Sequence, residues 1–144
     1  MTVGLLDVNV LLALFDPRHV HHEPAQQWFA AEGRKGWATC PMTENGFVRI
    51  ASQPSYPSSP GNAIVLRRLL TEFCRTSRHT FWPDRITLRD DKLFDPGVLV
   101  TSNHITDVYL LGLAVHNQGR LITFDRRIPA AAVRGGDKAL RILD

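Results

Sequence analysis

Two stretches decide the fold: Val3-Gly4-Leu5-Leu6-Asp7 near the start of the chain and Arg120-Leu121-Ile122-Thr123-Phe124-Asp125 near its end. Each is a short apolar run that ends in an aspartate, which is typical of a buried strand with a carboxylate at its carboxyl end. In an open parallel sheet, ligands bind at the carboxyl ends of the strands. We therefore expect Asp7 and Asp125 to point into one crevice, provided that their strands are neighbours.

The segments around these two strands alternate between further strands and helices. Strands are predicted at 37–40, 79–82 and 139–143, and helices at 10–15, 22–31, 41–51, 63–75 and 103–117. The segment 84–95 is ambiguous, with a short helix around Leu88 as one interpretation. Because strands alternate with helices, the pattern predicts an α/β fold, a three-layer α/β/α sandwich around a central parallel sheet.

Length and composition set the class of protein. The chain has 144 residues, 44% of them hydrophobic, so we expect a single domain over 1–144 with a packed core. A formal charge of +3 suits a polyanionic partner such as nucleic acid, although an ordinary surface explains it as simply. Cys40 and Cys74 lack metal-binding spacing and are predicted to be reduced thiols in a cytoplasmic protein. No apolar run is long enough to cross a bilayer, so we expect no membrane contact.

Two more acids, Glu44 and Asp107, lie near predicted helix starts, which in such a fold meet the same rim of the sheet. Converged carboxylates repel one another and stay ionised only if a cation compensates them. Oxygen-rich sites suit Mg²⁺ or Mn²⁺, which can activate water and stabilise charge on a phosphate. The pattern therefore predicts a metal-dependent phosphodiesterase. The plainer interpretation of each acid is a helix-start residue favoured by the helix dipole.

Histidines form a second group of candidates. His104 precedes Asp107 by three residues and would share its helix face if the helix extends that far. A local hydrogen bond is the preferred interpretation of His104, with a metal or RNA contact as the alternatives. We interpret His19, His21 and His22 as a solvated turn, with RNA contact as the alternative.

Four motifs in order resemble the PIN-domain family, most closely the toxin ribonucleases of VapBC toxin–antitoxin modules. They are Leu5-Leu6-Asp7-Val8-Asn9-Val10-Leu11, Thr43-Glu44-Asn45-Gly46-Phe47-Val48-Arg49, Thr106-Asp107 with the apolar helix that follows, and Leu121-Ile122-Thr123-Phe124-Asp125. Any one motif is weak, but four in order in a chain of this length are specific. The resemblance covers nearly the whole chain, and the stretch 52–103 contributes least to it.

The resemblance implies a Mg²⁺-dependent endoribonuclease that forms a homodimer and is inhibited by a cognate VapB-type antitoxin. By position, Asp7, Glu44, Asp107 and Asp125 match the acidic quartet of the family, with Asp7, Asp107 and Asp125 as metal ligands, Asn9 and Thr123 as supporting residues, and His104, Arg126 and Arg127 as candidate RNA contacts. The expected roles differ: Asp7 and Asp107 are the main ligands, Glu44 binds through water or positions the attacking water, and Asp125 serves a second ion or orients the ligands around the first.

Three other classes of protein were weighed. A phosphohydrolase of the haloacid dehalogenase type needs a second aspartate two residues after Asp7, where this chain has Asn9. A receiver domain needs a paired acid near Asp7 and a late lysine, but Arg126 follows Asp125. A non-catalytic RNA-binding or regulatory protein of the same fold stays open, because geometry decides catalysis.

Overall fold

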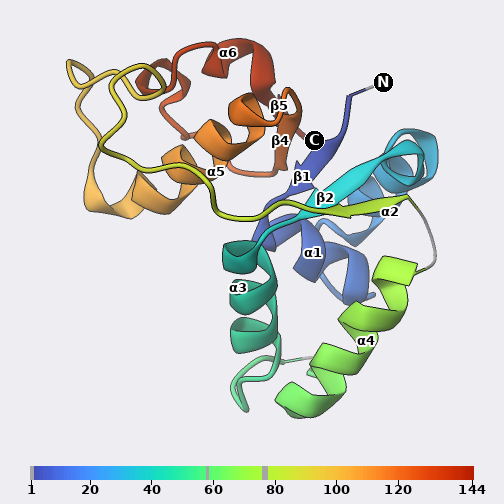
Figure 1. Cartoon of the computed structure of the whole chain (residues 1–144). Coiled ribbons are helices and arrows are strands. Elements are labelled where there is room, and N and C mark those ends of the chain that lie inside the picture. The colour runs from blue at the N-terminus through green and yellow to red at the C-terminus, as the bar shows by residue number, and fades with distance from the viewer. Residues whose placement is uncertain (1, 58, 76–77) are drawn as a thin grey trace.

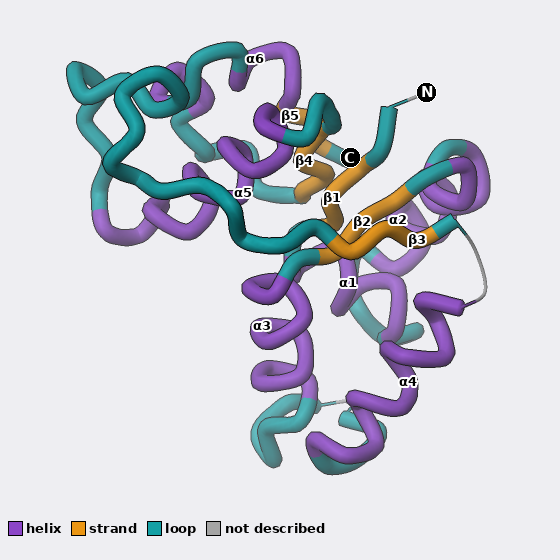
Figure 2. The backbone as a smooth tube through the Cα atoms, in the orientation of Figure 1, coloured by secondary structure: helices purple, strands orange, loops and turns teal. Residues whose placement is uncertain are grey.

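A five-stranded sheet forms the centre of the computed structural model, which describes residues 2–57, 59–75 and 78–144. The strand order is β3-β2-β1-β4-β5, and every neighbouring pair is parallel. The strands are β1 (Gly4–Leu6), β2 (Trp37–Thr39), β3 (His79–Phe81), β4 (Arg120–Thr123) and β5 (Leu140–Ile142). All five lie side by side in Figure 2. The predicted parallel sheet is therefore confirmed.

Helices cover both faces of this sheet (Figure 1). On one face lie α1 (Val8–Phe15), α2 (His22–Ala31), α3 (Pro41–Ala51) and α4 (Ala63–Arg75); on the other lie α5 (Ile105–His116) and α6 (Gly136–Ala139). Each face buries its own apolar cluster, so the three-layer α/β/α sandwich is confirmed. Within the described part of the chain, no helix has the length and apolar character that a membrane span needs.

The segment 84–95, between β3 and α5, forms turns and not the short helix that was one interpretation of its sequence. Asp90 and Asp95 accept, through their side chains, the backbone N–H groups of Lys92 and Gly97. Such local bonds offer the backbone an alternative to a helix. Phe94 is buried against the α5 face of the sheet and anchors the segment.

The order of the strands creates a switch point between β1 and β4. From β1 the chain moves outward through β2 to β3, and it then returns to the other side of β1 to form β4 and β5. At such a point the crossover connections diverge to opposite faces and leave a crevice at the carboxyl ends of the two strands. Leu6 pairs with Ile122, so Asp7 and Thr123 follow at matching positions beside this crevice.

Helices α3 and α4 pack against each other and project from the sheet as a pair (Figure 1). On α3, Phe47 is fully buried, and on α4 Leu66 and Leu70 are buried. Asn62 caps α4 as expected, because its Oδ1 accepts the backbone N–H groups of Ile64 and Val65 at 3.0 and 3.1 Å. This packing fixes α3, whose first turn carries Glu44.

We expect Phe47→Ala to lower the free energy of unfolding by about 3–5 kcal/mol, because it removes a fully buried ring and leaves a cavity. Met42→Ala is the matched control on the same helix. Met42 is 40% exposed, and its truncation should cost less than about 1 kcal/mol. Urea denaturation of both variants measures the difference, and equal losses would contradict the packing described for α3.

Candidate active site

Asp7 lies where β1 ends and α1 begins. Its backbone N–H donates to the carbonyl of Ile122 at 2.9 Å, and its Oδ1 accepts the N–H of Val8 at 2.8 Å, which caps α1. The residue is only 6% exposed. Burial raises the pKa of Asp7 above its ordinary value, and the charge of Asp125 raises it further, whereas hydrogen bonds from Thr123 and Val8 oppose this. Asp7 is thus a buried carboxylate held in one orientation.

Thr123, the last residue of β4, connects the site residues of the two strands. Its hydroxyl donates to Asp7 Oδ2 at 2.8 Å. The Oγ1 atom of Thr123 also accepts hydrogen bonds from Asn9 Nδ2 at 3.2 Å and from the backbone N–H of Asp125 at 3.1 Å. Asn9 Oδ1 accepts the backbone N–H of Phe124 at 3.2 Å. These bonds supply a physical reason for the supporting roles expected for Asn9 and Thr123.

Asp125 follows β4 at the mouth of the crevice, with 22% of its side chain exposed. Its Oδ1 accepts the backbone N–H of Arg127 at 2.8 Å, and the Nε of Arg127 lies 3.7 Å from the same oxygen. Arg127 is 84% exposed, so solvent screens this pair and it adds little stability. Arg126 is also exposed and pairs with Asp144. Both arginines therefore present their charge beside the site rather than inside it.

Asp107 reaches the same place from the first turn of α5. Its ligand atom, that of Asp125 and that of His104 all lie within 4.8 Å of one another. Burial and the charges of Asp7 and Asp125 raise the pKa of Asp107 to about 6, against the opposing effect of His104. The structure thus brings three of the four predicted acids together, from three separate segments.

His104 makes the local contact that the sequence analysis preferred. Its Nδ1 lies 3.4 Å from the hydroxyl oxygen of Thr101, while the same ring is close to Asp107 and Asp125. The residue sits at the N-cap position of α5 and is half-buried. A cation or an RNA phosphate at the site would therefore find this imidazole within reach.

The three aspartates fit a hard divalent cation. The charge of Asp125 raises the pKa of Asp7, and the charges of Asp7 and Asp125 raise the pKa of Asp107, because like charges repel; a bound cation would reverse both effects. Among the ion pairs of the described residues, no lysine or arginine neutralises Asp7 or Asp107. Oxygen ligands are those that Mg²⁺ and Mn²⁺ prefer. Asp7, Asp107 and Asp125 are accordingly the residues that would hold such an ion.

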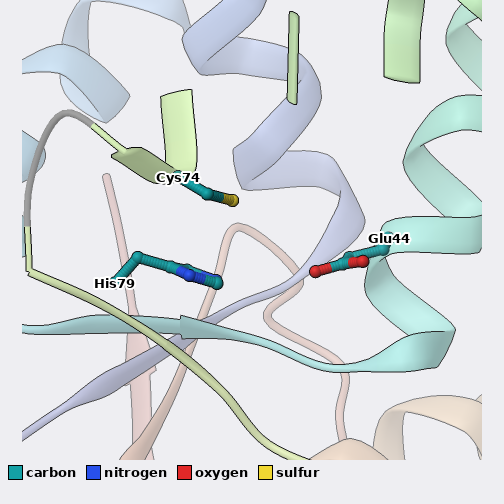
Figure 3. A group of neighbouring side chains, drawn as sticks. All are labelled: Glu44, Cys74 and His79. Atoms are coloured by element: carbon teal, nitrogen blue, oxygen red, sulfur yellow. The ribbon is translucent and has the colours of Figure 1, made fainter. Parts of the chain in front are cut away.

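Glu44, the fourth predicted acid, lies among different neighbours. Its Oε2 accepts the hydroxyl of Thr39 at 2.6 Å, and the Oγ1 of Thr39 also lies 2.7 Å from the Nε2 of His79. Glu44, Cys74 and His79 offer ligand atoms that all lie within 4.8 Å of one another (Figure 3). Burial and the charge of Glu44 raise the pKa of Cys74 to about 11, whereas burial lowers the pKa of His79.

No site role was predicted for Cys74 or His79, because neither belongs to a recognisable ligand motif. They belong to α4 and β3, and Glu44 comes from α3. Only the packing of α3 on α4 and the pairing of β2 with β3 bring the three together. The only signal available in the sequence was a cysteine near the end of one predicted helix and a histidine in the predicted strand that follows it.

His19 and His21 lie in the predicted turn and His22 begins α2, but the three rings are less solvated than predicted. The ring of His21 stacks on Phe124, with centroids 4.3 Å apart and planes 11° apart. Nδ1 of His22 lies 2.7 Å from the carbonyl oxygen of Ala13, and His19, His21 and His22 are all half-buried. The expectation failed because α1 and the end of β4 offer these rings partners.

A groove runs between α3 and α4 beside Glu44. Its polar lining includes Glu44, Asn45, Arg49 and Arg67. Two arginines and one acid along a groove give it a positive balance, which suits a phosphate backbone. The groove therefore begins at the first turn of α3, just after β2, and runs along α3 and α4.

Together, the fold and the site define an α/β domain with a carboxylate centre at the switch point of a parallel sheet. The family model described as PIN domain matches residues 4–134. The chain therefore belongs to the PIN-domain family.

Named relatives resemble the chain over most of its length. It is 46% identical over 135 residues to Ribonuclease VapC44 of Mycobacterium tuberculosis, and the matched region covers 94% of each chain. It is 40% identical over 132 residues to Ribonuclease VapC39 of the same organism, covering 92% of this chain and 95% of that one. A solved structure, VapBC2 from Rickettsia felis bound to a promoter DNA fragment, has the same fold: the TM-score is 0.57 over 99% of both chains, at 12% identity.

The raised pKa of Asp107 predicts how stability depends on pH without divalent cations. In the folded protein Asp107 holds its proton up to about pH 6, whereas its ordinary value is 3.8. The folded state therefore binds more protons in that window, and its stability falls as the pH rises from about 4 to about 6. We expect a loss of about 1–3 kcal/mol in EDTA, measured by urea denaturation.

Asp107→Asn is the control for this effect. The variant cannot ionise at this position, so the slope between those pH values should become shallower, with the raised pKa of Asp7 causing what is left, and the protein should be more stable than the wild type near neutral pH. A variant with the slope of the wild type would show that other groups cause it.

Proposed function

We propose that the chain is a Mg²⁺-dependent endoribonuclease and the toxin of a type II toxin–antitoxin system. The observation that carries this proposal is the cluster of Asp7, Asp107 and Asp125 around the switch point of the sheet. Relatives at 40–46% identity over most of the chain are named VapC ribonucleases, which supports RNA as the substrate. The whole chain, 1–144, serves as one nuclease domain in this proposal.

The chemistry is hydrolysis of an RNA phosphodiester. A bound Mg²⁺ ion would supply an activated water and neutralise charge on the phosphate. Asp7 and Asp107 are the main ligands, and Asp125 orients the ligands around that ion or serves a second one. Thr123 keeps the Asp7 carboxylate turned toward the crevice through its hydrogen bond. Glu44 acts from α3, through a water molecule, in binding the metal or in positioning the attacking water.

RNA reaches the aspartates across positively charged groups. Arg126 and Arg127 are exposed beside Asp125, and His104 adjoins Asp107 and Asp125. Arg49 and Arg67 line the groove between α3 and α4. Guanidinium groups suit phosphate oxygens because they donate two parallel hydrogen bonds. These residues bind the backbone of the substrate on either side of the bond that is cut.

The partners follow from the same relationship. A VapB-type antitoxin inhibits the enzyme by docking on its apolar helices and placing a basic residue at the acids, and the enzyme forms a homodimer in the cytoplasm. Ile64 and Leu69 of α4 are exposed hydrophobic residues that give such a partner an apolar surface. The name VapC, which the relatives carry, supports a toxin–antitoxin pair.

We expect purified protein to cut cellular RNA into discrete fragments with Mg²⁺ and not with EDTA. Asp7→Asn should lower the cleavage rate at least about 100-fold, because losing a ligand costs no less than losing an outer-shell partner. Asparagine is a good N-cap, so α1 should stay intact. Asp137→Asn, on α6 at the other end of the sheet, is the control and should cleave normally.

Two outcomes would count against the enzyme assignment. Equal cleavage by wild type and Asp7→Asn would point to a contaminating nuclease. Absence of cleavage by folded, antitoxin-free protein that still binds RNA would favour a non-catalytic RNA-binding role of the same fold.

Arg127→Ala should weaken RNA binding similarly for all sequences and reduce the slope of log K against log salt by about 1, because one phosphate contact is lost. Fluorescence anisotropy of a short RNA with the Asp7→Asn protein measures binding without cleavage. Arg34→Ala is the control: Arg34 is exposed in the turn of 3-10 helix before β2, at the amino ends of the strands and thus at the opposite end of the sheet from Asp125, and its loss should leave the slope unchanged. Equal slopes for wild type and Arg127→Ala would remove Arg127 from the RNA path.

A further inference from the structure

We propose that Glu44, Cys74 and His79 form a second metal site, for a transition-metal ion of the Zn²⁺ type, distinct from the aspartate centre. The three side chains come from α3, α4 and β3, and each offers one ligand atom within 4.8 Å of the other two. Figure 3 shows all three projecting toward one space between these elements. Glu44 also acts in the proposed ribonuclease mechanism, so an ion bound here would engage a carboxylate that the mechanism uses. The proposal itself concerns binding alone and does not depend on ribonuclease activity.

The spacing suits a metal ion after a small closing movement. Zn²⁺ lies about 2.0–2.3 Å from nitrogen, oxygen and sulfur ligands in a tetrahedral arrangement. Ligand atoms within 4.8 Å of one another need to approach a central ion by only a fraction of an ångström each. Long side chains such as that of Glu44 supply this movement by rotation, without a change in the backbone.

Thr39 already orients two of the three ligands. Its hydroxyl donates to Glu44 Oε2 at 2.6 Å, and its oxygen lies 2.7 Å from Nε2 of His79. Because the hydroxyl donates to Glu44, the Thr39 oxygen could accept a proton from Nε2 of His79, and Nδ1 would then be the ring nitrogen left for a metal. Metal-bound histidines commonly donate their second N–H to such an outer partner, which fixes the ring. Thr39 is fully buried and has this role at the end of β2.

The donor set selects the class of ion. A thiolate, an imidazole and a carboxylate are the ligands of Zn²⁺ sites, whereas Mg²⁺ avoids sulfur. On binding, the thiol of Cys74 passes its proton to solvent and becomes a thiolate. One thiolate and one carboxylate then balance the two positive charges of the ion, with water as a fourth ligand. All three residues are half-buried, so an ion has a path of entry.

Sulfur distinguishes this site from the aspartate centre. Asp7, Asp107, Asp125 and His104 offer only oxygen and nitrogen. A spectroscopic signal that requires a thiolate therefore reports on the Cys74 site alone. Bound metal would also tie α3, α4 and β3 together, because each contributes one ligand, and binding to the folded state alone raises stability.

The test is a titration of the full chain with Co²⁺, in a non-thiol reductant and with excess Mg²⁺ to occupy the aspartates. We expect a thiolate-to-cobalt charge-transfer band in the near ultraviolet, one equivalent of Co²⁺ per chain, and displacement of the band by Zn²⁺. A folded wild-type protein without this band would overturn the proposal.

Variants assign the ligands. Cys74→Ser and His79→Gln should each abolish the band or weaken Co²⁺ binding at least about 10-fold, because losing even a residue that only hydrogen-bonds to a ligand lowers metal affinity by that much. Cys40→Ser and His116→Gln are matched controls and should keep it; Cys40 is the N-cap of α3, a position that serine favours. Circular dichroism of every variant checks folding. A band that survives in Cys74→Ser, or vanishes in folded Cys40→Ser, would refute this assignment.

Discussion

The hydrogen bond from Thr123 to Asp7, 2.8 Å long, spans 116 residues of sequence and depends on the pairing of β1 with β4. Side chains alternate between the faces of a strand, so a slip of one residue would turn Thr123 away from Asp7. The register also sets the position of Asp125, whose N–H binds the same threonine oxygen. The apolar residues of β1 and β4, buried on both faces, hold that register.

The aspartate centre illustrates how a fold can hold groups together against their own repulsion. Burial and the charge of Asp125 make ionisation of Asp7 costly, and burial and the charges of Asp7 and Asp125 make ionisation of Asp107 costly. The helices and strands that carry these acids are fixed by two apolar clusters, one on each face of the sheet. The apolar core therefore offsets the electrostatic cost, and a divalent cation would lower it. Glu44, bound to Thr39, lies outside this balance.

Periodicity and strand-end acids predicted the fold well because they depend on local physics. The five strands, the main helices and the cap at Asn62 all formed where apolar patterns and breakers indicated. The structure of the segment 84–95 was not predicted, because the side chains of Asp90 and Asp95 accept backbone N–H groups and so offer an alternative to helical hydrogen bonds. The neighbours of Glu44 were not predicted, because no local sequence pattern connects Cys74 or His79 to α3. Only tertiary packing brings them together.

The distance along the chain between Asp7 and Thr123 also has a consequence for synthesis. A nascent chain that has left the ribosome only as far as α4 contains β1, β2 and Asp7 but neither α5 nor β4. Its first strand has no partner on the β4 side, and pairing of such distant segments comes late in folding. The aspartate centre therefore stays incomplete beside the ribosome until translation of its own message is nearly finished.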